Sequence, residues 1–397
     1  MYNSREASLQ TKRRLYALLQ RYQPIARSDL ATISGLTRAA VSNIVKEFIN
    51  IGLVEETDKA GTGIGRKKVL LRIREEAINL IGVDLGRKEI VARVYNAGGK
   101  VLKSEKLSFT MVRSLHENVM DTKKLLKNLL SWAQVEGITI DAVGIGVPGP
   151  VDTEKGIVHS APHFKGSETI KIKELVEKDF AIPTFVERDV NAAALGEHWF
   201  GEGRHNNSFI YLLVVEGIGA GIIINEQLYR GAHELAGKVG RFVFPAADDN
   251  EKLCMLEEFG SEISALNIAE DSARKREKGW LYSVLLKRSL GISDLIEGYR
   301  RKDISAIKAV ETMTYYAAIT VSNLVLLMDP ELIIIGGDFV KVHSGFVKDV
   351  HTRIKKILEG RPLPELKASS IHDISISLGA ATRALSEIIT QKKHPNT

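Results

Sequence analysis

The sequence predicts a small, mostly helical N-terminal domain that carries a β-hairpin, followed by a larger α/β body. Three observations predict this organisation. Residues 9–52 place apolar side chains at helical spacing, with breaks at Pro24 and Gly35. From about residue 75 onward, short apolar runs that end in Gly-rich turns alternate with helical patterns. The charge divides at the same place, because residues 1–74 carry a net charge of +8 and the remainder carries −2.

The overall composition excludes several classes of protein. The 397 residues are 44% hydrophobic and 26% charged, which are ordinary values for a globular chain and not those of a disordered or collagen-like protein. No apolar run reaches the roughly 18 residues that span a bilayer, and the N-terminus lacks the apolar segment of a secretory signal. Cys254 is the single cysteine, so it can form neither an internal disulfide nor a thiolate zinc site by itself. We therefore expect a cytoplasmic protein that does not bind membranes.

The N-terminal pattern predicts three helices. The first ends near Tyr22, and Ser28 is the expected N-cap of a short second helix. A tight turn at Gly35 follows, and Thr37 is the expected N-cap of a third helix that runs to about residue 52. Helix, glycine turn and helix in this spacing are typical of the helix-turn-helix DNA-binding motif.

The third helix is the expected base-reading helix, since the second helix of such a pair enters the major groove with its N-terminal residues. Arg can pair with guanine and Asn with adenine, while a small Ala allows close approach. The expected DNA-contacting residues of this helix are Thr37, Arg38, Ala39, Ser42 and Asn43. Residues 53–73 then predict two short strands around a Gly-rich turn, a wing whose basic residues Arg66, Lys67 and Lys68 would meet phosphates. The alternative is a three-helix core with an incidental basic hairpin and a solvated basic face.

This N-terminal segment resembles the winged helix-turn-helix of bacterial sugar-responsive repressors in the ROK family (repressors, open reading frames, kinases). The family's usual wording is close to SRAELARLTGLSRATVSRIVKELIEEGLV, and this chain reads ARSDLATISGLTRAAVSNIVKEFINIGLV. The resemblance covers about 60 residues. It implies operator DNA as the partner, bound by a dimer.

The body, from about residue 80 to 390, resembles the actin-like (ribonuclease H-like) ATPase and sugar kinase fold in its ROK branch. The resemblance implies two subdomains that close on a cleft, and a homodimer or homotetramer. It implies a DNA-binding domain at 1–75, a first subdomain at 76–190 and a second at 191–397, with the last helix returning to the first subdomain. The positions that match the family's nucleotide loops are Asp84 and Gly86 in DLGRKEI, Gly217 and Gly219 in VEGIGAGII, and Gly336 and Gly337 in IIIGGD.

The residues depart from the family pattern where a kinase would do its chemistry. Asp189 in ERDVNAAALGE takes the position of the catalytic base, but capping the helix that follows is its alternative role. Glu216 stands where the second loop has a threonine, which places a carboxylate where phosphates would lie. Met255 stands where the family has a zinc-binding cysteine. We therefore expect no zinc, weakened ATP binding and no kinase activity, with Asp189 as a vestigial base.

The positions that hold the sugar in the family also change. The family has Asn, Asn, Glu and His there, and this chain has His163, Arg188, Lys238 and Arg241. Together with Asp189 and Glu257 they form the expected effector site. Three alternatives remain for these cations: salt bridges to Glu187, Glu234 or Glu257 that close the cleft, an anionic effector such as a sugar phosphate or sugar acid, or a neutral sugar.

The leading hypothesis is a sugar-responsive transcriptional regulator, a repressor of carbohydrate-utilisation genes whose kinase-like body senses a carbohydrate-derived effector. An active ATP-dependent sugar kinase that carries a DNA-binding arm is the competing hypothesis. Intact phosphate loops and an intact ExGH motif would favour the kinase, and both are altered here. A regulator driven by a partner protein is the third.

Overall fold

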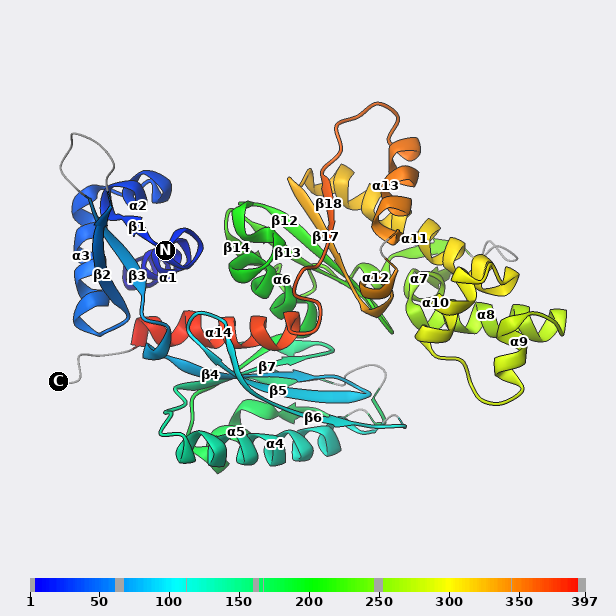
Figure 1. The fold of residues 1–397 in the computed structure, drawn as a ribbon, viewed down its shortest axis with the longest axis horizontal. Coiled ribbons are helices and arrows are strands. Elements are labelled where there is room, and N and C mark those ends of the chain that lie inside the picture. The colour runs from blue at the N-terminus through cyan, green and yellow to red at the C-terminus, as the bar shows by residue number, and fades with distance from the viewer. Residues whose placement is uncertain are drawn as a thin grey trace. The chain divides into compact units, whose positions relative to one another are not determined.

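The computed structural model describes residues 4–60, 68–111, 113–159, 164–166, 168–245, 253–343 and 345–391. The chain forms two compact units, the first made of Met1–Phe200 with Asp373–Thr397 and the second of Gly201–His372. The first unit contains the N-terminal domain and the sheet that follows it (Figure 1). Within the described residues, no helix combines the length and apolar character needed to cross a membrane.

The N-terminal domain is a winged helix-turn-helix, as the sequence predicts. Its sheet has the strand order β1-β3-β2. Gly35 adopts the left-handed conformation, with φ of 69°, between the second and third helices. The expected N-cap at Ser28 is wrong, because the second helix begins at Arg27 and its N-cap is Ala26, two residues earlier, without a side-chain bond. The hydroxyl of Ser28 instead donates to Asp29. The elements are α1 (Ser4–Tyr22), β1 (Ile25–Ala26), α2 (Arg27–Ser34), α3 (Arg38–Asn50), β2 (Val54–Ala60) and β3 (Lys68–Ile73).

The rest of the first unit is built on a sheet with the order β11-β7-β4-β5-β6. The strands β4, β5 and β6 are antiparallel neighbours, whereas β7 and β11 run parallel to β4. Helix α14 lies on one face of this sheet and α4 and α5 cover the other (Figure 1). The bounds are η1 (Glu75–Ala77), β4 (Asn79–Leu85), β5 (Glu89–Asn96), β6 (Val101–Ser108), α4 (Leu115–Val135), β7 (Ala142–Val147), β8 (Val151–Asp152), β9 (Ile157–Val158), β10 (Ile170–Lys171), α5 (Ile172–Phe180), β11 (Thr184–Arg188), α6 (Asp189–Phe200) and α14 (Ser375–Gln391).

Helix α14 packs on its neighbours at backbone contact distance. A Cβ atom added to Gly379 would lie 1.6 Å from the carbonyl oxygen of Ala192 in α6. A Cβ atom added to Gly144 of β7 would lie 1.9 Å from the carbonyl oxygen of Ala380. Only glycine fits at these positions, so α6, α14 and the sheet form one packed body. The expected boundary at 190/191 is therefore wrong by one helix, because α6 belongs to the first unit and the division falls after Phe200.

The second unit has a sheet with the order β14-β13-β12-β17-β18. The long helix α11 buries one side against α8 and α13, and Met313 and Val321 of α11 are fully buried in this core. The bounds are η2 (Glu202–His205), β12 (Phe209–Val214), β13 (Ile218–Ile224), β14 (Gln227–Tyr229), η3 (Val239–Arg241), β15 (Val243–Pro245), β16 (Leu253–Met255), α7 (Glu257–Gly260), α8 (Glu262–Arg276), α9 (Trp280–Leu285), α10 (Ile292–Arg300), α11 (Ile304–Met328), β17 (Leu332–Gly336), α12 (Asp338–Val342), α13 (Phe346–Ile357) and β18 (Glu365–Ala368).

Candidate functional site

Helix α3 has the geometry of a base-reading helix. Thr37 occupies its N-cap, and the Oγ1 atom of Thr37 accepts a hydrogen bond from the backbone N–H of Ala40 at 3.2 Å. The inner face is anchored by Val41, Val45 and Phe48, all buried. The outer face of the first two turns carries the residues expected to contact DNA: Thr37, Arg38, Ala39 and Asn43 are exposed and Ser42 is half-buried. The structure thus presents all five to solvent on one short stretch of helix.

The wing is described only at its base. The strands β2 and β3 pair antiparallel, with an irregularity between Thr57 and Ala60. Arg66 and Lys67 lie outside the described residues. The Nζ atom of Lys68 donates to Oδ1 of Asp29 in α2 at 2.7 Å, and this hydrogen bond lowers the pKa of the Asp29 carboxyl. Such exposed pairs contribute about 1 kcal/mol at most, so Lys68 can exchange Asp29 for a phosphate. Its contact with DNA stays a prediction.

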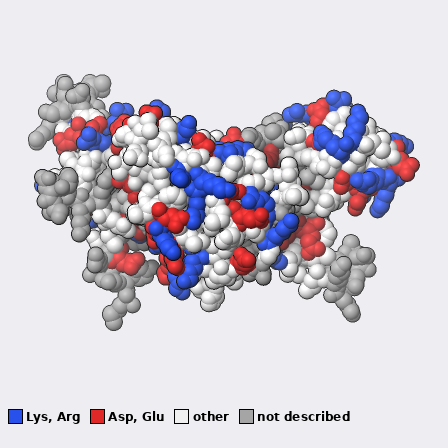
Figure 2. Space-filling model, turned by 90° about the horizontal axis from the view of Figure 1, so that it is seen from below, with Lys and Arg blue, Asp and Glu red and all other residues white. Residues whose placement is uncertain are grey.

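The face of the molecule in Figure 2 carries basic and acidic side chains interspersed with one another. Ion pairs of the body include Lys123 with Asp179 and Lys171 with Glu174. A surface with mixed signs attracts phosphates less than a single-sign patch does. The net charges, +8 for residues 1–74 and −2 for the remainder, favour the N-terminal domain as the part that contacts DNA.

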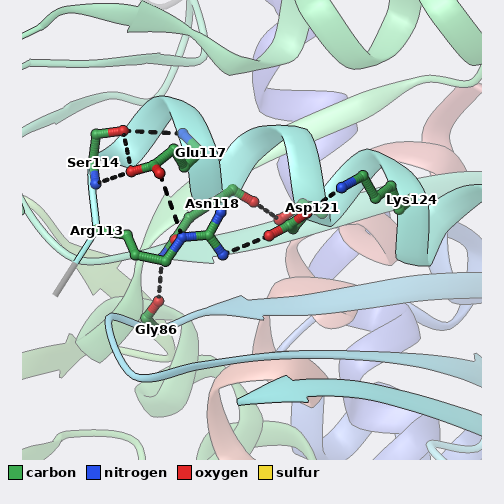
Figure 3. A network of polar contacts seen from close by, with 8 residues as sticks. Gly86, Arg113, Ser114, Glu117, Asn118, Asp121 and Lys124 are labelled. Atoms are coloured by element: carbon green, nitrogen blue, oxygen red, sulfur yellow. Dashed lines mark hydrogen bonds and ion pairs between the residues drawn. The ribbon is translucent and has the colours of Figure 1, made fainter. Parts of the chain in front are cut away.

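The loop that matches the first phosphate loop is held by the protein itself. Gly86 follows β4, and its carbonyl oxygen accepts a hydrogen bond from Nδ2 of Asn118 at 3.0 Å (Figure 3). The carbonyl oxygen of Lys88 accepts one from the backbone N–H of Phe109 at 2.7 Å. A Cβ atom at Gly86 would lie 2.7 Å from the carbonyl oxygen of Glu89, so this glycine has a packing reason apart from any nucleotide.

The start of α4, beside this loop, is closed by a capping box. The hydroxyl of Ser114 accepts from the backbone N–H of Glu117 at 3.2 Å, and the carboxylate of Glu117 accepts from the backbone N–H of Ser114 at 2.8 Å. The backbone bond from Ser114, followed by the bond from its hydroxyl, lowers the pKa of Glu117. Helix N-termini bind phosphates through such N–H groups, and here a carboxylate already occupies this one (Figure 3).

A second acidic residue of α4, Asp121, completes the network in Figure 3. Burial raises the pKa of Asp121, but hydrogen bonds from Lys124 and Arg113 outweigh it, and the pKa lies below its usual range. Arg113 Nη1 donates to Asp121 Oδ2 at 2.5 Å and its guanidinium lies over the ring of Phe109. The network fixes the segment before α4 against the loop at residues 86–88.

The turn that matches the adenosine site is also shaped by packing. A Cβ atom at Gly336 would lie 2.0 Å from the hydroxyl oxygen of Tyr211, and one at Gly337, where φ is 132°, would lie 1.8 Å from the carbonyl oxygen of Val214. The buried carboxylate of Glu262 accepts from the backbone N–H of Phe339 in the first turn of α12, at 2.7 Å. This backbone N–H group is therefore already bound by a protein carboxylate. Weak ATP binding stays a prediction.

The second loop lies in the hairpin between β12 and β13. The backbone N–H of Val215 donates to the carbonyl oxygen of Gly217 at 3.0 Å, and Gly219 pairs with Leu213 in the ladder. Glu216 lies in this turn, as the sequence predicts. Its effect on phosphate binding also stays a prediction.

In the first unit, Arg188 and Asp189 form the junction between β11 and α6. Asp189 is the first residue of α6, so it lies inside the helix and not at its N-cap; its Oδ1 accepts from the backbone N–H of the adjacent Val190 at 2.7 Å. Its roles as a cap or as a vestigial base stay predictions. Arg188 is buried, and its Nη2 donates to Oδ1 of Asn191 at 2.9 Å. Nδ2 of Asn191 in turn donates to Oε1 of the buried Glu187 at 3.0 Å. His163 lies outside the described residues, so its place relative to Arg188 stays untested.

In the second unit, Arg241 contacts the position of the lost zinc ligand. Its Nη1 atom lies 2.9 Å from Sδ of Met255, and its Nε atom lies 3.6 Å from Oε1 of Glu257. The resemblance implies zinc ligands at both positions, a histidine where Arg241 stands and a cysteine where Met255 stands, and neither a guanidinium nor a thioether is a zinc ligand. Cys254 beside them is buried. Within the described residues, no three His, Cys, Asp or Glu side chains gather where they could hold a metal ion.

The ion pair between Arg241 and Glu257 matches the compensation by acidic residues that the sequence left open. Lys238 precedes Arg241 at the start of η3. Arg241 is 50% exposed as a side chain, so its charge remains accessible to solvent. The sequence did not single out Asn118 or Glu262, because their partners lie 32 and 77 residues away. The local pattern shows only a polar residue near the start of each helix, which does not reveal the distant partner.

The N-terminal domain is a winged helix-turn-helix whose recognition helix is capped and faces solvent. It is joined to an actin-like body whose nucleotide loops are altered. Together they define a DNA-binding regulator built on a sugar kinase fold. The chain belongs to the ROK family, which matches residues 80–387, and its residues 9–55 match the winged helix-turn-helix DNA-binding family. It is therefore a ROK-family transcriptional regulator, as its sequence predicts.

Curated relatives match most of the length of this chain. A xylose repressor of Caldicellulosiruptor bescii is 29% identical over 376 residues, 92% of this chain and 93% of the repressor. The DNA-binding transcriptional dual regulator NagC of Escherichia coli is 25% identical over 339 residues, 82% of this chain and 80% of NagC.

Solved structures share the fold. A ROK family transcriptional regulator, a homologue of the Escherichia coli MLC protein, superimposes with a TM-score of 0.78 at 21% identity, over 97% of this chain and 98% of that one. A ROK family glucokinase from Streptomyces griseus, solved with glucose and AMPPNP, superimposes with a TM-score of 0.66 at 25% identity, over 76% of this chain and 98% of the kinase. The body is thus shared with kinases, and the N-terminal domain is what the regulators add.

Proposed function

We propose that this protein is a transcriptional repressor of carbohydrate-utilisation genes whose kinase-like body binds a carbohydrate-derived effector. The observation that carries the proposal is the outer face of α3. Arg38 and Asn43, the side chains suited to guanine and adenine, are exposed there, while Thr37 caps the helix and orients its first turn. A repressor of this class acts where operator DNA lies, in the cytoplasm.

The effector site is proposed at the altered sugar positions. Arg241 is half-exposed and its contact with Glu257 is long, at 3.6 Å, so an incoming phosphate or carboxylate can replace Glu257 on the guanidinium. This geometry supports an anionic effector, such as a sugar phosphate or a sugar acid. A xylose repressor and NagC among the relatives support a sugar-derived ligand.

The kinase alternative is disfavoured by the carboxylates at two helix starts. Glu117 closes the start of α4 beside the loop that matches the first phosphate loop, and Glu262 accepts from the first turn of α12 beside the turn that matches the adenosine site. Phosphoryl transfer depends on donors that surround the ATP phosphates. Protein carboxylates already bind backbone N–H groups at both places, which disfavours a sugar kinase with a DNA-binding arm.

The assembly is proposed to be a homodimer, since helix-turn-helix proteins bind two half-sites about one helical turn of DNA apart. Light scattering on the full chain measures this directly, and the selected DNA should be an inverted repeat. A monomer that binds a single, non-repeated site would contradict the dimer without contradicting the repressor.

The test of the proposed function has two steps. First, the full chain is used to select duplexes from a random DNA pool, and we expect enrichment of one sequence with nanomolar to micromolar affinity that falls with salt. Second, calorimetry compares xylose, glucose and N-acetylglucosamine with their phosphates and with uronic acids, at two salt concentrations. An anionic ligand should bind more weakly at high salt and should lose binding in Arg241→Ala. No enriched duplex would refute the regulator, and salt-independent binding of a neutral sugar would refute the anionic effector.

A further inference from the structure

A continuous chain of polar contacts runs from the β11–α6 junction to the DNA-binding domain, all within the first unit. At the junction, Arg188 donates to Asn191, and Asn191 donates to Glu187. Across from Glu187 lies Arg383 of α14, whose Nε atom is 4.0 Å from Oε2 of Glu187. These contacts join a position of the proposed effector site to the C-terminal helix.

From Arg383 the chain continues to α1. Nη1 of Arg383 binds Oε1 of Glu387, one turn further along α14, and Oε2 of Glu387 binds Nη2 of Arg13. Nε of Arg13 also donates to the carbonyl oxygen of Ser386 at 2.9 Å. The one carboxylate of Glu387 therefore holds two guanidiniums, one from α14 and one from α1. The side chains of Arg13, Arg383 and Glu387 are only 17–20% exposed, so water screens these pairs weakly.

Helix α1 also contacts the recognition helix, α3. Lys12 of α1 forms an ion pair with Glu47 of α3. Tyr16 of α1 is fully buried, with its ring centroid 5.7 Å from that of Phe48 in α3 and 6.2 Å from that of Trp199 in α6. A movement of α1 must therefore move α3, because the two helices share an aromatic contact and an ion pair.

Arg383 is the residue in this series of contacts whose partners can change. Its Nε atom is buried and makes no hydrogen bond within the described part of the protein, while Glu187 lies just beyond hydrogen-bond distance. A shift of about 1 Å at the end of β11 would convert this long ion pair into a hydrogen bond, and would reorient the guanidinium that also binds Glu387. The guanidinium fork suits this role because it can face two carboxylates at once.

We propose that Arg383 is a positioning residue that transmits the state of the Arg188–Asp189 junction to the recognition helix, through Glu387 and Arg13. Its regulatory meaning rests on the proposed function, since Arg188 is one of the altered sugar positions. A ligand that contacts Arg188 or Asp189 differently in two states would change the position of Glu187 and its contact with Arg383. The position of α1 would then change through Glu387 and Arg13.

Contiguity alone does not prove coupling, so the test is a double-mutant cycle on the full chain. Arg188→Ala perturbs the junction, with Asn191→Ala as a second, milder perturbation. Each is combined with Arg383→Gln and, as a matched control, with Asp179→Asn, which removes the ion pair between Lys123 and Asp179 on α4 and α5. The readout is amide hydrogen exchange in peptides from α1 and α3, with α11 peptides as an internal reference for general loosening.

We expect the junction variants to speed exchange in α1 and α3 by about 3-fold or more in the wild-type background and in Asp179→Asn. In Arg383→Gln the same perturbations should change it by less than about 1.5-fold, because the link is already broken. Arg383→Lys should behave like Arg383→Gln, since an ammonium cannot face both carboxylates. Equal effects in all backgrounds, or no effect of either junction variant on α1 and α3, would overturn the proposal.

The same cycle on affinity for the DNA selected by the wild-type chain separates the two proposals. If no duplex is selected, the proposed function fails, while the exchange data still decide the coupling. If a duplex is selected, the junction variants should change its dissociation constant about 3-fold or more in wild type and not in Arg383→Gln. Additive effects on the dissociation constant would refute coupling through Arg383, while the proposal that the protein is a repressor would stand.

Discussion

The substitution Arg38→Ala tests the recognition helix most directly. Arg38 is the first residue of α3, its side chain is exposed, and within the described residues it forms no hydrogen bond or ion pair. Removing it should therefore leave the folded domain as stable as before. A bidentate contact of Arg with guanine contributes about 1–3 kcal/mol of discrimination, so affinity for the selected operator should fall roughly 5- to 150-fold at 25 °C.

Two matched variants on the same helix separate reading from folding. Thr37→Ala removes the hydrogen bond that the backbone N–H of Ala40 donates to Oγ1 of Thr37 at 3.2 Å, and should lower the free energy of unfolding by about 1 kcal/mol. Lys46→Ala removes the same charge as Arg38→Ala, but from the exposed second half of α3. It should weaken all duplexes alike and keep the base preference.

The assay is fluorescence anisotropy with the selected duplex and a set of duplexes that differ from it at single base pairs, combined with urea unfolding of each variant. The expected pattern is relaxed preference at one base pair for Arg38→Ala, with unchanged unfolding. If Arg38→Ala lowers affinity equally for every duplex, by the same factor as Lys46→Ala, Arg38 is a phosphate contact at most and the base-reading assignment is wrong.

Four further predictions follow from particular contacts. Gly379→Ala should lower the free energy of unfolding by about 3 kcal/mol in urea titrations, because its Cβ atom would lie 1.6 Å from a carbonyl oxygen of α6. Gly291→Ala, at the N-cap of α10 with its nearest neighbour atom at 3.7 Å, should cost no more than about 1 kcal/mol, and equal costs would contradict the close packing of α14. Elemental analysis of the purified chain should find no stoichiometric zinc, since Arg241 and Met255 contact each other at the former ligand positions; zinc that is lost together with thermal stability on chelation would show otherwise. A coupled assay should detect no ATP-dependent phosphorylation of glucose, N-acetylglucosamine, mannose or xylose, and turnover abolished by Asp189→Asn would restore the kinase. Burial raises the pKa of Tyr95 to about 12, so the folded state keeps a proton that the unfolded chain releases near pH 10. The free energy of unfolding should therefore fall as the pH rises from about 10 to about 12. In Tyr95→Phe it should fall less steeply in this range, and an identical slope would rule out a contribution from Tyr95.

The local elements of the fold follow from the sequence because their signals are local. The cap at Thr37, the left-handed turn at Gly35 and the end of α1 at Tyr22 depend on residues within a few positions of one another. The exposed residues of α3 follow from its buried apolar stripe in the same way. Ser28 shows the limit of such signals, because Asp29 beside it competes for its hydroxyl and the helix begins without a side-chain cap.

The altered motif residues could also be read directly. Glu216, Arg241 and Met255 are departures in residue type, and they change the chemistry of a loop wherever the loop lies. Their partners could not be read: Arg241 contacts Met255 across a hairpin, and Glu262 reaches Phe339 over 77 residues. These contacts depend on how strands pair and on which helix starts meet which loops.

The sequence by itself determined the order of the domains, the recognition helix and the chemical character of each altered motif, because periodicity, caps and residue types act over a few positions along the chain. Only the tertiary structure decided that α6 belongs to the first unit and that Arg13 binds Glu387, 374 residues away. The reason is that such contacts depend on backbone packing, here the approach of Gly379 in α14 to Ala192 in α6, which no local pattern encodes. The same packing places the C-terminal helix between the β11–α6 junction and the DNA-binding domain.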